Sequence, residues 1–307
     1  MTYRMRISST LGIDRLESEL YKSFNWLKER GCSIETRYEK QNEYHCLLVT
    51  LHYPKKGVFF REGDFIYIFK YQVSEVIAEH IVDLWEEELV RRSLDKTYRG
   101  LLPEDRSLVL EKALSFMKCC DESESLGLLM RFGRKSRIAH RVLDHLLDND
   151  VLVLDGFVNF YLRDYLKEIQ FAVDVAWEEV NSEKEYNEFV KLLRYFVDSQ
   201  PSHIREVNLL VTGLGKFSMW DEKGNSIDES YVRACLEEIF TDDINTDDVL
   251  VSVLITLAPR RVVLHGKEEK MGNSESLKII RKVFKERISI CTGCARCQGN
   301  VVTEREV

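Results

Sequence analysis

Three cysteines near the end of the sequence have the residue type and spacing for binding a metal. Cys291, Cys294 and Cys297 form a C-x2-C-x2-C pattern within Cys-Thr-Gly-Cys-Ala-Arg-Cys. Two intervening residues let the chain curl so that the thiolates converge on one ion or cluster. Gly293 can adopt the backbone conformations that such a curl often requires. The spacing therefore predicts a zinc or iron–sulfur site.

The pattern needs a further ligand. Its match to the bacterial ferredoxin run C-x2-C-x2-C-x3-C-P ends after the third cysteine, because Val301 takes the fourth position. His265 is the first candidate for the missing donor and Cys235 the second; without either, the site is an open three-thiolate one. Three thiolates with His265 would suit zinc, whereas open iron coordination would suit a cluster. Two other interpretations stay open: a redox dithiol of Cys294 and Cys297, and small buried residues that bind nothing.

The elements around the cysteines predict where their side chains lie. Residues 261–265 read as a strand, 275–284 as a helix and 287–291 as a second strand. A strand-helix-strand crossover places its strands in parallel, so both end at the same edge of the sheet. If the two strands are neighbours, His265 lies close to Cys291.

The rest of the chain predicts an α+β fold. Residues 3–8, 33–38, 44–52 and 65–71 alternate or are rich in β-branched and aromatic residues, which indicates a small N-terminal sheet beside a helix that starts near Ile13. The pattern from 73 to 200 is almost wholly helical. A β-hairpin around 221–225 and helices at 230–240 and 247–258 then precede the crossover.

We therefore expect three domains. Residues 1–72 form a small α/β N-terminal domain, and residues 73–200 form a helical domain. Residues 201–307 form a C-terminal α/β unit that carries the cysteine cluster and packs on the helical domain.

Charge and hydropathy exclude some classes of protein. The 307-residue chain has a net charge of -8, which makes general binding to nucleic acid or anionic lipid unfavourable. The N-terminus has no apolar stretch typical of a secretory signal, and residues 249–258 are too short to span a bilayer. We expect a cytoplasmic protein that does not enter a membrane and whose cysteines are thiols or metal ligands.

A run of basic residues offers an alternative function. It contains no acidic residue and comprises Arg131, Arg134, Lys135, Arg137 and Arg141. Such a run could contact a phosphate backbone, but it opens an amphipathic helix and is better explained by pairing with acids nearby.

Four segments together resemble one known family. They are DGFVNFYLRDYL at 155–166, EYNEFVKLLRYFVD at 185–198, LITLAPRRVVLH at 254–265 and ICTGCARC at 290–297. This set resembles the YtxC-like sporulation proteins of endospore-forming bacteria. The resemblance implies a cytoplasmic protein linked to sporulation. The family offers no assigned catalytic residue, so only the cysteine pattern carries over, as a pattern without a proven ligand.

The leading hypothesis is a non-enzymatic or regulatory protein with a metal site at Cys291, Cys294, Cys297 and His265, and without catalytic residues. One alternative is a redox enzyme that uses an open cluster or a dithiol at the C-terminus. Another is a module that binds nucleic acid or an unknown protein partner through the basic run.

Overall fold

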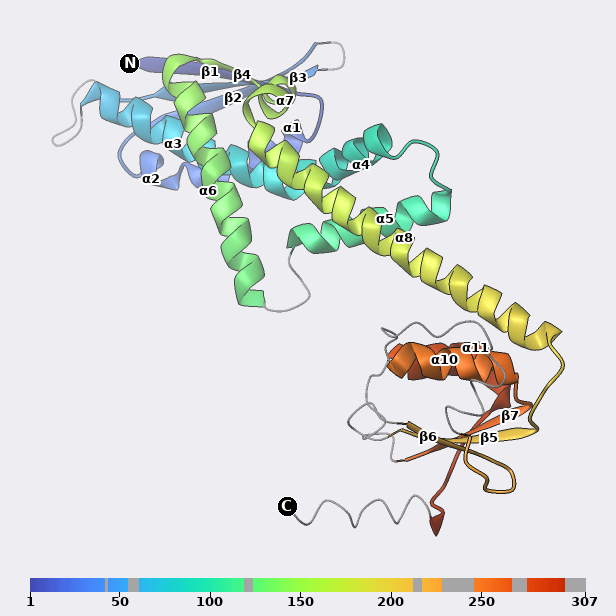
Figure 1. Ribbon diagram of the computed structural model, residues 1–307. Coiled ribbons are helices and arrows are strands. Elements are labelled where there is room, and N and C mark those ends of the chain that lie inside the picture. The colour runs from blue at the N-terminus through green and yellow to red at the C-terminus, as the bar shows by residue number, and fades with distance from the viewer. Residues whose placement is uncertain are drawn as a thin grey trace. The chain divides into compact units, whose positions relative to one another are not determined.

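The computed structural model describes residues 1–41, 44–54, 61–118, 124–211, 217–227, 246–266 and 275–295. The chain divides into two compact units, Met1–Asn181 and Ser182–Val307, each with its own apolar core (Figure 1). Two small sheets and many helices make the fold α+β, as the sequence predicts. The three-domain division at residues 72 and 200 stays a prediction.

The first unit combines a sheet with helices. Its elements are β1 (Thr2–Ser9), α1 (Ile13–Ser23), α2 (Asn25–Lys28), β2 (Ser33–Gln41), β3 (Tyr44–His52), α3 (Glu62–His80), a π-helical turn (Ile81–Trp85), α4 (Glu86–Thr97), α5 (Pro103–Lys118), α6 (Glu124–Asp148), β4 (Val151–Val153), α7 (Leu154–Tyr161) and the first part of α8 (Arg163–Ser199). The strand order is β2-β3-β1-β4, and β4 is parallel to β1. Met5 and Ile7 alternate with more exposed neighbours along β1 and reach the core.

The expected strand at residues 65–71 is wrong, because these residues lie within α3. Phe65, Phe69 and Val73 are buried, whereas Tyr67 and Tyr71 between them are exposed. In a strand all five side chains would share one face, so the pattern is that of a helix. Phe69 stacks on Phe24 with ring centroids 5.2 Å apart. In the first turn of the helix, the carboxylate of Asp64 accepts a 2.8 Å hydrogen bond from the backbone N–H of Arg61.

The turn before α1 requires glycine. Gly12 has a φ of 70°, and a Cβ there would overlap the side chains of Leu84 and His80. We expect Gly12→Ala to lower the free energy of unfolding by about 1–3 kcal/mol through overpacking. Gly31→Ala is the matched control, since Gly31 also has a positive φ but no atom lies within 4 Å of its Cβ position. Equal losses for both variants in denaturant unfolding would show that the overlap is relieved without cost.

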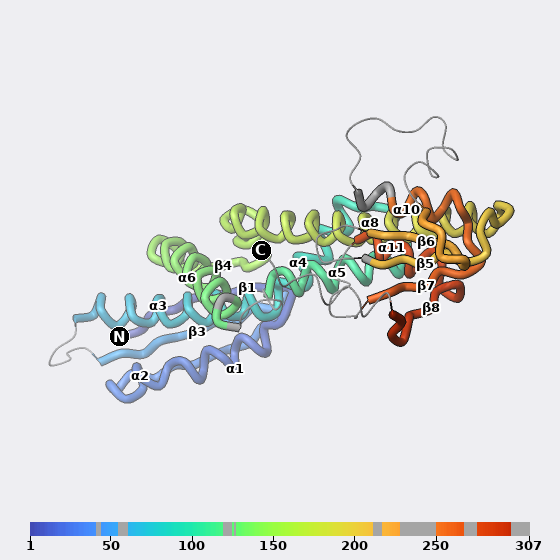
Figure 2. Tube along the Cα trace, turned by 60° about the horizontal axis from the view of Figure 1, so that its bottom comes forward, coloured from blue at the N-terminus to red at the C-terminus, as the bar shows by residue number. Residues whose placement is uncertain are grey.

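The second unit contains the crossover predicted from the sequence. Its elements are the last part of α8, β5 (Glu206–Val211), β6 (Phe217–Asp221), α10 (Thr246–Leu257), β7 (Arg261–His265), α11 (Glu275–Phe284), a 3-10 turn (Lys285–Arg287) and β8 (Ile288–Ile290). The strand order is β6-β5-β7-β8, as Figure 2 shows, and β5, β7 and β8 are parallel. The helix expected at 230–240 lies outside the described residues.

The hairpin expected around residues 221–225 is confirmed. β5 and β6 pair antiparallel, and Trp220 bridges to Ser226 across the turn. The carboxylate of Asp221 accepts hydrogen bonds from the backbone N–H groups of Lys223 and Asn225, both at 2.8 Å. After the turn the chain returns along β6, where the backbone N–H of Ile227 donates to the carbonyl oxygen of Met219 at 2.9 Å. Among the described residues, no helix is both long and apolar enough to cross a bilayer.

Candidate metal centre

The crossover brings two strand ends together. β7 and β8 are neighbours and parallel, with Leu264 opposite Ile290. His265 is the last residue of β7, and Cys291 directly follows β8. The backbone N–H of Cys291 donates to the carbonyl oxygen of Leu264 at 2.9 Å, which holds Cys291 beside the end of β7. The expected proximity of His265 and Cys291 is confirmed.

A turn then brings the second cysteine back towards the histidine. Gly293 has a φ of 123°, a backbone conformation that favours glycine. The Cys294 Sγ atom lies 3.4 Å from His265 Nδ1. The potential ligand atoms of His265, Cys291 and Cys294 all lie within 4.8 Å of one another. Residues from two strand ends and one turn therefore converge on a single point.

The spacing of these atoms fits a small metal ion. With Zn–S near 2.3 Å and Zn–N near 2.0–2.1 Å, tetrahedral ligands place sulfur and nitrogen about 3.6 Å apart. The observed 3.4 Å between Cys294 Sγ and His265 Nδ1 is close to that value. His265 is buried, whereas Cys291 and Cys294 are half-buried. Cys297 and Cys235 lie outside the described residues.

Two further residues hold the imidazole, and sequence reasoning missed both. The Oδ1 atom of Asn208 in β5 accepts a 2.9 Å hydrogen bond from His265 Nε2. The Trp220 ring of β6 lies against the imidazole, with centroids 4.8 Å apart and planes at 44°. The one available signal was Asn208 itself, a polar residue within the apolar strand Val-Asn-Leu-Leu-Val.

Comparison with known proteins decides the family. The model of the YtxC-like family matches residues 71–289, which is more than half of the chain. The chain belongs to the YtxC-like family. A curated relative, the "Uncharacterized protein YtxC" of Bacillus subtilis (strain 168), is 24% identical over 226 residues, covering 71% of this chain and 75% of the relative. No solved structure matches.

The YtxC-like match includes Asn208, Trp220 and His265 but ends before Cys291. Membership of the YtxC-like family is therefore established by the helical region and the sheet. The two cysteines enter the argument through their geometry alone.

The basic run of this YtxC-like chain pairs with carboxylates, but these lie on other elements, whereas the sequence predicts partners close by. Ion pairs join Arg131 to Asp83, Lys135 to Glu79 (3.0 Å), Arg137 to Glu168 and Arg141 to Asp164 (3.9 Å). Each of these cations thus faces a carboxylate of α3, the π-helical turn or α8. A phosphate backbone would have to compete with these acids for the same side chains.

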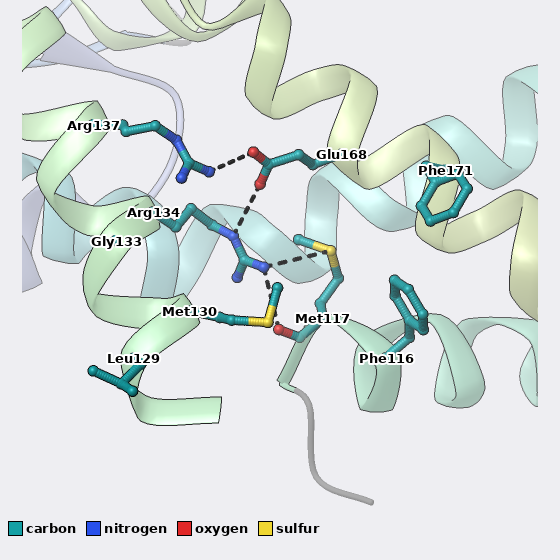
Figure 3. A pocket seen from close by; sticks show the side chains of 9 residues that line it. All are labelled: Phe116, Met117, Leu129, Met130, Gly133, Arg134, Arg137, Glu168 and Phe171. Carbon is teal, nitrogen blue, oxygen red and sulfur yellow. Dashed lines mark hydrogen bonds and ion pairs between the residues drawn. The ribbon is translucent and has the colours of Figure 1, made fainter. Parts of the chain in front are cut away.

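Arg134 differs from the rest of the run because it is only 5% exposed. Its guanidinium contacts Glu86 at 3.0 Å and Glu168 at 3.4 Å, and it donates to the carbonyl oxygen of Met117 at 3.3 Å. Figure 3 shows it at the polar side of a cavity of about 560 Å³. The cavity is otherwise lined mainly by apolar side chains, namely Phe116, Met117, Leu129, Met130 and Phe171.

Proposed function

We propose that this chain binds a metal ion through His265, Cys291 and Cys294, with Cys297 as the additional thiolate. The observation that carries the proposal is the convergence of one imidazole and two thiols within 4.8 Å at adjacent strand ends. A mixed nitrogen and sulfur set is typical of structural zinc, so zinc is the favoured ion. An iron–sulfur cluster is the alternative cofactor, because the three cysteines keep cluster spacing.

The proposed role of the metal is structural or sensing rather than catalytic. A bound ion would link the segment after β8 to the end of β7. The two ligands that it would join, His265 and Cys291, are 26 residues apart in the sequence. A closed four-ligand site leaves no position for a substrate. A redox function of Cys294 and Cys297 would require both thiols to be free of metal. The metal analysis described below distinguishes this function from metal binding.

The cellular role is part of the same proposal. The family resemblance supports a cytoplasmic protein connected with sporulation. The net charge of -8 and the pairing of the basic run with carboxylates argue against nucleic acid as its partner. A protein partner is compatible with the exposed apolar side chains beside the cavity in Figure 3, such as Leu129 and Phe171.

Metal analysis tests the proposal. Protein purified without oxygen is expected to contain about one zinc ion per chain, since one tetrahedral site holds one ion. Cys294→Ser should lose it, and Cys32→Ser, which removes a buried thiol of the first unit, should retain it. Iron together with inorganic sulfide would identify a cluster instead. Absence of both metals from the wild type, together with a reversible Cys294–Cys297 disulfide, would replace the metal site with a redox dithiol.

A further inference from the structure

We propose that Asn208 is the positioning residue of the metal site: it holds the proton of His265 on Nε2, so that Nδ1 is the nitrogen offered to a metal. This inference rests on the proposed function. Its first step, however, concerns the metal-free protein and can be measured there.

The neighbours of Asn208 determine which way its amide group points. Asn208 is 8% exposed and lies on β5, between β6 and β7. Its Nδ2 lies 3.4 Å from the backbone carbonyl oxygen of Asp221 and 3.3 Å from Glu206 Oε1. A carbonyl oxygen and a carboxylate can only accept hydrogen bonds, so the donor side of the amide must face them. The Oδ1 atom must then face His265.

The amide orientation in turn fixes the histidine tautomer. Oδ1 of Asn208 can only accept, so the 2.9 Å contact requires a proton on His265 Nε2. In a neutral imidazole the other nitrogen then carries a lone pair. That nitrogen, Nδ1, is the one 3.4 Å from Cys294 Sγ. The protonated nitrogen thus points into the sheet, and the ligating nitrogen points to the thiols.

Trp220 supports the same arrangement. Its ring packs on the imidazole at 4.8 Å and restricts rotation of the ring, which would otherwise exchange the two nitrogens. Trp220 and Asp221 are adjacent on β6, so one strand both packs on the imidazole and accepts from Asn208. The two paired strands β5 and β6 therefore orient His265, a ligand that belongs to β7.

Outer hydrogen-bond partners of ligating histidines change metal affinity by about 10–100-fold when they are replaced. We expect Asn208→Leu, which removes the acceptor, to weaken binding of Co²⁺ and Zn²⁺ by a factor in that range. Asn208→Asp keeps an acceptor opposite Nε2 and should retain more of the affinity than Asn208→Leu, while its second oxygen loses the hydrogen bonds to Glu206 and Asp221. The ligand-field absorption of Co²⁺ shows whether sulfur and nitrogen ligands are still bound in each variant.

Nitrogen-15 NMR of histidine-labelled protein without metal measures the tautomer directly. The wild type should show His265 with its proton on Nε2, assigned by loss of its signals in His265→Gln, and Asn208→Leu should show a mixture of tautomers. A proton on Nδ1 in the wild type would overturn the inference, as would unchanged Co²⁺ affinity in a folded Asn208→Leu protein. If the wild type binds neither Co²⁺ nor Zn²⁺, the proposed function fails, while the tautomer still decides the role of Asn208.

Discussion

Replacing Arg134 with methionine is expected to lower the free energy of unfolding of the first unit by about 3–5 kcal/mol, the usual cost of breaking a buried ion pair from one side. Arg134 NH1 lies 3.0 Å from Glu86 Oε2, and the same oxygen accepts a 3.0 Å hydrogen bond from the Tyr165 hydroxyl. Glu86 is 7% exposed. Without Arg134 its carboxylate remains buried without its principal cation.

The loss should depend on pH in a defined direction. Burial raises the pKa of Glu86 above its ordinary value of 4.5, and the positive charge of Arg134 opposes that rise. The folded chain therefore holds the Glu86 proton more tightly than the unfolded chain, so stability falls as the pH increases from 4.5 through the folded-state pKa. Removing Arg134 raises that pKa further. Denaturant unfolding near pH 4.5 and near neutrality should thus show the larger deficit near neutrality.

A second substitution provides the control. Glu86→Gln in the Arg134→Met background removes the uncompensated charge, while the amide oxygen can still accept from Tyr165. The double variant should recover most of the lost stability and lose the extra pH dependence. If it is no more stable than Arg134→Met alone, the packing of the arginine stem accounts for the loss, and the ion pair does not.

The basic run illustrates what sequence can and cannot predict. Pairing with acids could be expected from the amphipathic pattern of α6, but the partners lie on other elements, such as Asp83 for Arg131 and Glu79 for Lys135. The burial of Arg134 does not follow from that pattern, because it depends on how the helices that carry Glu86 and Tyr165 pack against α6. Only the packing of α4, α6 and α8 distinguishes this arginine from the exposed ones on either side.

Likewise, only part of the candidate metal site can be predicted from the sequence. The proximity of His265 to Cys291 could be predicted because a single crossover connects neighbouring parallel strands. The contacts of Asn208 and Trp220 with His265 could not be predicted, because they depend on which strand lies on the other side of β7. The order β6-β5-β7-β8 places β5 there and sets Leu210 opposite His265. Strand order and register are long-range properties that the local pattern does not contain.

Local pattern also misassigned residues 65–71. Ile66, Tyr67 and Ile68 have β-branched or aromatic side chains, yet the surrounding residues bury one helical face against Phe24. Tertiary packing outweighs strand propensity here, since propensity differences amount to at most about 1 kcal/mol. In a strand, Tyr67 would lie on the same face as Phe65 and Phe69, whereas in the helix Phe65 and Phe69 are buried and Tyr67 is exposed.

Zinc is expected to stabilise the second unit against unfolding by an amount fixed by mass action. A ligand that binds only the folded state adds about 2.7 kcal/mol at 100 times its Kd and about 4.1 kcal/mol at 1,000 times. All three described ligands belong to this unit, and they join the end of β7 to the turn after β8. Since thiols and imidazole must lose protons to bind zinc, the gain should shrink as the pH falls.

Trp220 provides a specific readout, because the other three tryptophans are at positions 26, 85 and 177, within the first unit. Fluorine NMR of fluorotryptophan-labelled protein, assigned with Trp220→Phe, follows its resonance through a denaturant titration. With zinc, the unfolding transition reported by Trp220 should move to a higher denaturant concentration, and Cys294→Ser should abolish that shift. A transition that zinc leaves in place, or that moves equally in Cys294→Ser, would mean that zinc does not bind at His265 and the cysteines.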